Sequence, residues 1–182
     1  YTFTGLILFV FCIISFFFLL PDSNIFDGHY VIDTFGTNLK IIALIAATLV
    51  HLGSFKSKQN IKNEIFLIQL FATLGVMILC SAHNLLTVYL GLETLTLSMY
   101  GIVASNRNSI EATESAMKFF ILGAIASAIF LYGVSILYGV TGTLSLDLIK
   151  DSILLDTLEM RIAVAFMACG IIFKFGAFPF HS

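Results

Sequence analysis

The sequence predicts an all-α membrane protein: a polytopic bundle of about six transmembrane helices that forms a single membrane domain over residues 1–182. Fifty-nine per cent of the 182 residues are hydrophobic and only 11% are charged, whereas a soluble domain carries roughly 25% charged residues. The apolar residues form long runs, which indicate helices, because a membrane barrel alternates apolar and polar residues. We expect helices over residues 3–20, 38–54, 63–80, 83–104, 110–139 and 160–178.

Polar breaks define the first four of these helices. Pro21-Asp22-Ser23-Asn24 ends the first, and three lysines between residues 56 and 62 separate the second from the third. Ser81-Ala82-His83-Asn84 interrupts the next apolar run. Because Ser and Asn are favoured N-cap residues, Ser81 or Asn84 is expected to cap the fourth helix.

The last two helices have their own start and stop signals. Asn108 followed by Glu111 is typical of a capping box at the start of the fifth helix. Gly139 and Gly142 are expected to end that helix. Residues 140–159 carry five charged side chains and are expected to form a polar loop.

The distribution of basic residues predicts the orientation in the membrane. Lys56, Lys58 and Lys62 lie between the second and third helices, and Arg107 lies between the fourth and fifth. In a zigzag of helices these two loops share one side, and the positive-inside rule assigns it to the inside. The opposing loops carry almost no Lys or Arg before Lys150.

Two expected helices carry small residues at helical spacing, which lets membrane helices approach closely. We interpret both stripes as packing surfaces rather than substrate sites. They comprise Ala116, Gly123, Ala124, Ser127 and Ala128 in one helix, and Thr87, Gly91, Thr94 and Ser98 in the other.

Glu93 lies near the middle of its expected helix, about ten residues from either end, or roughly 15 Å. A charge at that depth costs at least about 2.5–3.5 kcal/mol on insertion scales, so such residues usually mark ion or proton pathways. Tyr89, Glu93, Thr96 and Tyr100 share one helix face and form a polar stripe. The alternative interpretation of this stripe is a structural hydrogen-bond network.

Lys174 lies about fourteen residues into the last expected helix and is followed by Gly176 and Pro179. Pro179 removes a helix hydrogen bond and predicts a discontinuous final helix. Irregular backbone at membrane depth is tolerated where it lines a hydrated cavity or is buried in protein. We therefore interpret Lys174 as an ion-binding residue; the alternative is an interfacial lysine at an ordinary helix end.

Two further residues are weaker candidates. Lys118 lies about two turns into its helix, with Glu114 four residues earlier. It could act in transport, or it could pair with Glu114 and extend to the interface. His181 follows the predicted break and could relay protons or cap the chain end.

Three segments together resemble a known family: Asn84–Glu93, Glu114–Ala124 and Phe173–His181. They resemble the antiporter-like membrane subunits of respiratory complex I, specifically the chain 2 (subunit N) group of NADH–quinone oxidoreductase. The resemblance covers about residues 25–182 in order and spacing, which is more specific than any single motif. Residues 131–142 favour chain 2 over chains 4 and 5 and over cation/proton antiporter subunits.

The resemblance implies an antiporter-like fold of two inverted five-helix repeats, each with one discontinuous helix, of which this chain is the first part. It implies that Glu93, Lys174 and Lys118 match the charged residues of one proton path, with Lys174 as the usual partner of Glu93. Tyr89 and Tyr100 on the polar stripe and His181 after the break are weaker candidates for the same relay. Family members continue through a second repeat, whereas this sequence stops within the first broken helix. We therefore expect the N-terminal part of a split subunit, a degenerate subunit or a fragment.

The implied function is proton translocation in the membrane arm of an NADH:ubiquinone oxidoreductase, without a redox site on this chain. The alternatives are a structural half-subunit scaffold and a cation/proton antiporter subunit. No dinucleotide fingerprint, iron–sulfur motif or haem ligand pair occurs, and the three cysteines are isolated. We expect no cofactor or metal on this chain, with NADH, FMN, iron–sulfur clusters and quinone on other subunits.

The expected partners are the other membrane-arm subunits, including neighbouring antiporter-like subunits, together with membrane lipid and a separate chain that supplies the missing half. The net charge of −2 provides no basic surface for nucleic acid. The bias toward Phe and Ile favours a mitochondrially encoded chain of the inner membrane. The bacterial plasma membrane is the alternative.

Overall fold

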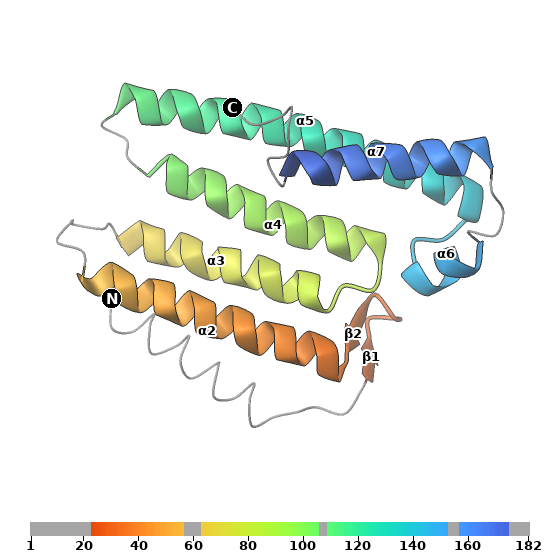
Figure 1. Ribbon diagram of the computed structural model, residues 1–182, viewed down its shortest axis with the longest axis horizontal. Helices are drawn as coiled ribbons and strands as arrows, with labels where there is room; N and C mark the ends of the chain where they lie inside the picture. The colour runs from red at the N-terminus through yellow and green to blue at the C-terminus, as the bar shows by residue number, and fades with distance from the viewer. Residues whose placement is uncertain (1–22, 57–62, 106–108, 153–156, 175–182) are drawn as a thin grey trace.

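The computed structural model describes residues 23–56, 63–105, 109–152 and 157–174, and these residues form six helices and one short hairpin (Figure 1). The predicted all-α membrane architecture is confirmed, with the hairpin as an unpredicted addition. The helix expected at 3–20 and the break expected after residue 174 lie outside the described residues. In chain order the elements are β1 (Ser23–Ile25), β2 (Tyr30–Ile32), α2 (Thr34–Lys56), α3 (Asn63–Cys80), α4 (Leu85–Val103), α5 (Ile110–Thr141), α6 (Leu146–Ser152) and α7 (Leu158–Lys174).

The start of α2 differs from the predicted boundary. The helix begins at Thr34 rather than at residue 38. The Asp33 carboxylate accepts a hydrogen bond from the Gly36 backbone N–H at 2.7 Å and so satisfies an otherwise unpaired donor of the first turn. By contrast, the predicted boundaries of α3 are confirmed.

The ends of α5 confirm one predicted signal and correct another. Ser109, not Asn108, is the N-cap residue, and its side chain accepts a hydrogen bond from the Ala112 N–H. Asn108 itself lies outside the described residues. At the other end the helix runs to Thr141, so Gly139 lies inside it and the predicted end at residue 139 is wrong. Gly142 is the C-cap with φ of 69°, a left-handed conformation in which glycine is favoured.

Two segments that we expected to be irregular contain secondary structure. Within residues 21–37, β1 and β2 pair antiparallel, and within 140–159 the short helix α6 forms. The hairpin depends on a distant part of the chain, because the Val31 N–H donates to the Ser81 carbonyl at 3.0 Å and the His83 N–H donates to the His29 carbonyl at 3.2 Å. These bonds join residues about fifty positions apart and have no local sequence signal.

The α3–α4 connection also holds α6. The Leu146 N–H donates to the His83 carbonyl at 3.2 Å. His83 Nε2 lies 2.7 Å from the Asp147 carboxylate oxygen Oδ2. One short connection therefore attaches both the hairpin and α6 to the same end of the bundle.

The helices follow one another across the bundle in chain order. α2 packs on α3, α3 on α4 and α4 on α5, and α7 then packs on α5 (Figure 1). The C-terminal ends of α2 and α4 and the N-terminal ends of α3 and α5 lie at one end of the bundle, and the hairpin and α6 lie at the other (Figure 1). This arrangement agrees with the zigzag on which the predicted orientation depends.

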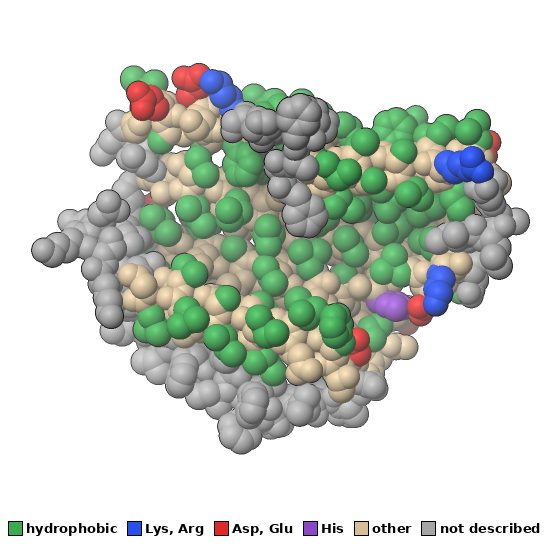
Figure 2. Space-filling view, in the orientation of Figure 1, with side chains coloured by type: hydrophobic (Ala, Val, Ile, Leu, Met, Phe, Trp, Pro, Cys, Tyr) green, Lys and Arg blue, Asp and Glu red, His purple; other side chains and the backbone are tan. Residues whose placement is uncertain are grey.

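The surface is suited to lipid. Figure 2 shows hydrophobic side chains across the middle of the visible face and charged side chains gathered toward its two ends. Among the described residues, three segments are long and apolar enough to cross a membrane: Thr34–Gly53, Leu85–Val103 and Ile110–Thr141. Glu64–Cys80 is a shorter apolar helix. In water such exposed apolar flanks would favour aggregation.

Asn84→Ala is expected to destabilise the start of α4. Asn84 is buried, and its side-chain oxygen accepts a hydrogen bond from the Leu86 N–H at 2.9 Å, as predicted for a cap. Loss of an N-cap side chain costs about 1 kcal/mol, so the thermal unfolding midpoint of the purified protein should fall. Asn38→Ala on the exposed face of α2 is the control, and equal midpoints for the two variants would contradict the capping role.

Candidate functional site

The polar stripe of α4 faces α5, and its residues share one helix face as predicted. The Tyr89 ring stacks on Phe130 of α5, with centroids 6.3 Å apart and an interplanar angle of 10°. Tyr100 is buried against Gly123 of α5, where any Cβ atom would overlap its hydroxyl. The stripe therefore lies at a helix–helix contact, with Glu93 between the two tyrosines.

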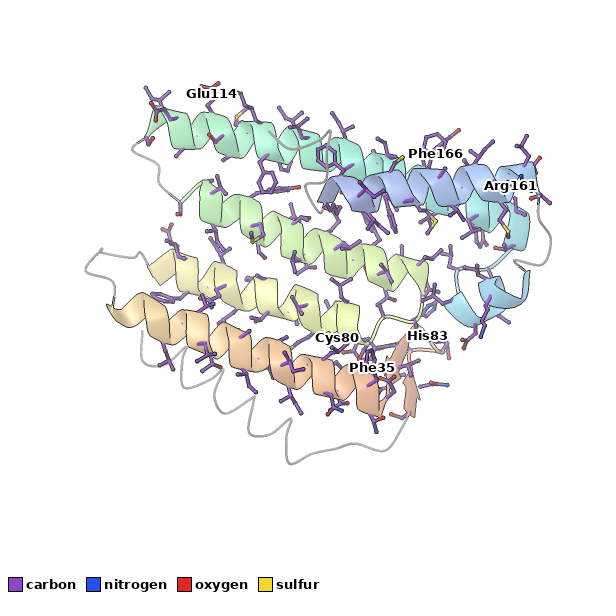
Figure 3. The ribbon with its side chains drawn as sticks, viewed as in Figure 1. Phe35, Cys80, His83, Glu114, Arg161 and Phe166 are labelled. Carbon is purple, nitrogen blue, oxygen red and sulfur yellow. The ribbon has the colours of Figure 1, made fainter. Side chains whose placement is uncertain are left out.

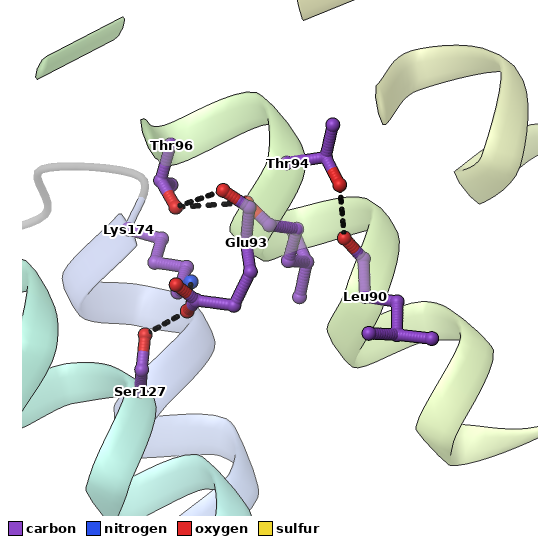
Figure 4. A network of polar contacts seen from close by, with 7 residues as sticks. Leu90, Glu93, Thr94, Thr96, Ser127 and Lys174 are labelled. Atoms are coloured by element: carbon purple, nitrogen blue, oxygen red, sulfur yellow. Dashed lines mark hydrogen bonds and ion pairs between the residues drawn. The ribbon is translucent and has the colours of Figure 1, made fainter. Parts of the chain in front are cut away.

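At the centre of this contact Glu93 meets side chains from two other helices (Figure 4). Lys174 Nζ of α7 lies 3.0 Å from Glu93 Oε1. The Ser127 hydroxyl of α5 donates a hydrogen bond to the same oxygen. A single carboxylate oxygen thus joins α4, α5 and α7.

The ion pair is enclosed by the bundle. The Lys174 side chain is 8% exposed and the Glu93 side chain 22%. Glu93 lies eight residues after the first residue of α4 and ten before the last, which is roughly 12–15 Å of helix in either direction. Removing one member of such a pair typically costs about 3–5 kcal/mol, because the other is left as an uncompensated buried charge.

Small residues bring the last turn of α7 to this position. A Cβ atom on Gly133 of α5 would lie 2.7 Å from the Ala163 carbonyl oxygen of α7. A Cβ atom on Gly170 of α7 would lie 2.9 Å from the Ala126 carbonyl oxygen of α5. The two backbones are therefore in direct contact, and Lys174, one turn beyond Gly170, reaches Glu93.

The structure does not bring Lys118 into this cluster. Lys118 Nζ lies 2.6 Å from Glu114 Oε1 on the same helix, and the two side chains are 68% and 61% exposed. Figure 3 shows Glu114 near the N-terminal end of α5. The geometry is that of the local ion pair that the sequence left open as an alternative.

The sequence did not identify Ser127 as a functional candidate. The small-residue spacing of α5 predicted packing, and Ala116, Gly123 and Ser127 are indeed buried. A hydroxyl inside a stripe of Gly and Ala was the available signal, because a buried polar group needs a hydrogen-bond partner. His181 lies outside the described residues.

The arrangement can store and exchange a proton without redox chemistry. A carboxylate and an ammonium group in direct contact titrate as a coupled pair. A change in their separation alters how strongly each group holds its proton. The described site therefore holds two ionisable groups whose interaction depends on the position of α7 relative to α4.

Comparison with protein families gives a match over more than half of the chain. The family described as NADH:quinone oxidoreductase/Mrp antiporter, TM, matches residues 82–182. This range includes Glu93, Ser127 and Lys174.

Curated relatives are similar to the chain over most of its length. It is 40% identical over 169 residues to the NADH-quinone oxidoreductase subunit N of Thioalkalivibrio sulfidiphilus, covering 88% of this chain and 35% of the relative. It is 45% identical over 169 residues to that of Alkalilimnicola ehrlichii, covering 86% of this chain and 33% of the relative. The chain therefore spans about a third of the length of these relatives.

Solved structures share the fold. A chain of respiratory complex I from Thermus thermophilus with bound Aureothin superposes with a TM-score of 0.77 at 28% identity, covering 98% of this chain and 39% of that one. A chain of the membrane-bound sulfane sulfur reductase, an archaeal respiratory membrane complex, gives a TM-score of 0.86 at 22% identity, covering 98% and 40%. The second similarity concerns the fold alone.

Proposed function

This chain belongs to the NADH:quinone oxidoreductase/Mrp antiporter transmembrane family, and from that premise we propose that it translocates protons in the membrane arm of an NADH–quinone oxidoreductase. The observation that carries the proposal is the Glu93–Lys174 pair, which lies within the helix bundle rather than at its ends. Ionisable residues inside membrane bundles are the usual elements of proton relays.

The proposed mechanism uses the pair as a switch. With Lys174 protonated beside Glu93, each charge stabilises the other. Movement of Lys174 away from Glu93 would leave both charges uncompensated, so Lys174 would release a proton or Glu93 would accept one. Lys118, which the structure places on the exposed flank of α5, is a secondary element of the path in this proposal.

The remaining assignments follow from the same proposal. The chain carries no cofactor, and NADH, FMN, iron–sulfur clusters and quinone belong to other subunits of the complex. Its partners are neighbouring membrane-arm subunits and a segment or chain that supplies the second repeat. Because the relatives come from bacteria, we place the chain in a bacterial plasma membrane; they give no support to the mitochondrial inner membrane that the composition favoured.

Glu93→Gln in the complete complex is expected to abolish most proton translocation, because glutamine keeps the shape but cannot carry a charge or exchange a proton. The measurement is the NADH-driven pH gradient across membrane vesicles, normalised to the rate of NADH oxidation. Glu111→Gln, at an exposed position in the first turn of α5, is the matched control.

Two outcomes contradict the proposal. Normal proton translocation by assembled Glu93→Gln complex would exclude a relay through this residue and favour the scaffold function. A pH gradient that depends on Na⁺ or K⁺ and not on NADH would favour the independent antiporter.

A further inference from the structure

We propose that Ser127 is a positioning residue for proton translocation: its hydroxyl fixes the Glu93 carboxylate at the junction of α4, α5 and α7 while Lys174 changes its state. The inference rests on the proposed function, since it assigns Ser127 a part in the same relay. It starts from the shared acceptor, because Ser127 Oγ and Lys174 Nζ both donate to Glu93 Oε1.

The direction of the Ser127 hydrogen bond is unusual for a hydroxyl in a helix. Serine and threonine in helix interiors commonly donate to a carbonyl of the preceding turn. Thr94 and Ser98 of α4 do so, donating to the Leu90 and Thr94 carbonyls at 2.7 Å each. Ser127 instead donates to a carboxylate on the neighbouring helix, 34 residues away in the sequence.

The surroundings hold this hydroxyl in place. Ser127 is 6% exposed. One turn before it, Gly123 contacts the Tyr100 hydroxyl, and three residues after it Phe130 stacks on Tyr89. The α4–α5 contact is thus fixed on both sides of Ser127, and its hydroxyl stays directed at Glu93.

The Ser127–Glu93 hydrogen bond remains in place when Lys174 separates from Glu93. The Ser127 bond comes from α5 and does not depend on the position of Lys174 on α7. When Lys174 moves or loses its proton, Ser127 still donates to Glu93 and keeps the charged carboxylate aligned for the return of the proton. A hydrogen bond to a charged carboxylate favours its charged form, so loss of the Ser127 donor is expected to change the pH dependence of proton translocation.

Few titratable groups face Glu93 in the described residues. Lys174 reaches it from α7, and Tyr89 and Tyr100 interact with it electrostatically from its own helix. From α5 the group in contact is the Ser127 hydroxyl, which does not titrate in the physiological range. A change in pH dependence caused by Ser127 substitution therefore reports on the Glu93–Lys174 pair.

The test measures the pH profile of NADH-driven proton translocation in membrane vesicles that contain the complete complex with Ser127→Ala. Without this donor the charged carboxylate loses one stabilising hydrogen bond, so the acid-side midpoint of the measured profile is expected to move to higher pH by about one unit. Ser127→Thr retains the hydroxyl and is expected to restore the original midpoint. Ser98→Ala is the matched control, because Ser98 is equally buried at 6% exposure but donates within α4.

An unchanged midpoint in Ser127→Ala, or the same shift in Ser98→Ala, would overturn the inference. If the Ser127→Ala complex does not assemble, Ser127→Thr is compared with Ser127→Val, because valine has the shape of threonine but lacks the hydroxyl. Equal midpoints for the threonine and valine variants would also overturn the inference. Glu93→Gln reports separately on the proposed function. If Glu93→Gln loses translocation while the Ser127→Ala profile is unchanged, the role of Ser127 is rejected and the proposed function of Glu93 is retained.

Discussion

Lys174→Met in the complete complex is expected to abolish most of the proton translocation coupled to NADH oxidation. Methionine keeps the length and apolar stem of the side chain but removes the ammonium group 3.0 Å from Glu93 Oε1. Glu93 then lacks its buried counter-charge and is expected to hold a proton instead of exchanging it. The measurement is the ratio of protons translocated to NADH oxidised in membrane vesicles.

The same substitution at an exposed lysine is the control for this variant. Lys150→Met in the short helix α6 alters an exposed side chain at the end of the bundle and is expected to leave the ratio unchanged. Lys118→Met is expected to have an intermediate effect, since Lys118 pairs with Glu114 and not with Glu93. A normal ratio in assembled Lys174→Met complex would exclude the pair as the proton relay.

Gly133→Ala is expected to weaken the contact between α5 and α7 and to lower the amount of assembled protein. The added methyl group would lie 2.7 Å from the Ala163 carbonyl oxygen and 2.8 Å from the Met167 backbone nitrogen. Because both atoms belong to the α7 backbone, no side-chain rotation relieves the overlap and the helices must separate. Overpacking of this kind typically costs about 1–3 kcal/mol.

A second glycine of α5 gives the control for packing. A methyl group added at Gly139 would have no atom within 4 Å among the described residues. Gly139→Ala is expected to be neutral or to stabilise the helix by roughly 0.5–1 kcal/mol, because alanine loses less backbone entropy than glycine. Thermal unfolding of the two purified variants in detergent distinguishes them, and equal stability would mean that α5 and α7 tolerate a wider separation.

Much of the described fold could be predicted from local sequence signals. Long apolar runs interrupted by polar breaks located α3, α4 and α5, since the backbone of a lipid-exposed segment must satisfy its own hydrogen bonds. Asn84 and Gly142 were correct as helix ends because capping depends on residues within one turn. The stripe containing Glu93 was predicted for the same reason, since the helical period alone determines which residues share a face.

The two elements that the sequence did not predict are those whose structure depends on distant residues. The hairpin depends on hydrogen bonds from Val31 to Ser81 and from His83 to His29. The helix α6 is attached through Leu146 and Asp147 to the same connection. Neither segment has enough length or periodicity to predict an element on its own.

For the site, the sequence by itself determined that a carboxylate and a lysine would lie within a membrane bundle. Long apolar runs surround Glu93 and precede Lys174, so both residues were expected at membrane depth. Their pairing across 81 positions in the sequence was implied only by the family resemblance. Tertiary structure alone decided that Ser127 joins the pair and that Lys118 does not. The physical reason is that helical periodicity defines a face, whereas the contacts of that face depend on how closely neighbouring backbones approach. Here that approach is set by Gly123, Gly133 and Gly170, which bring three helices to one carboxylate oxygen.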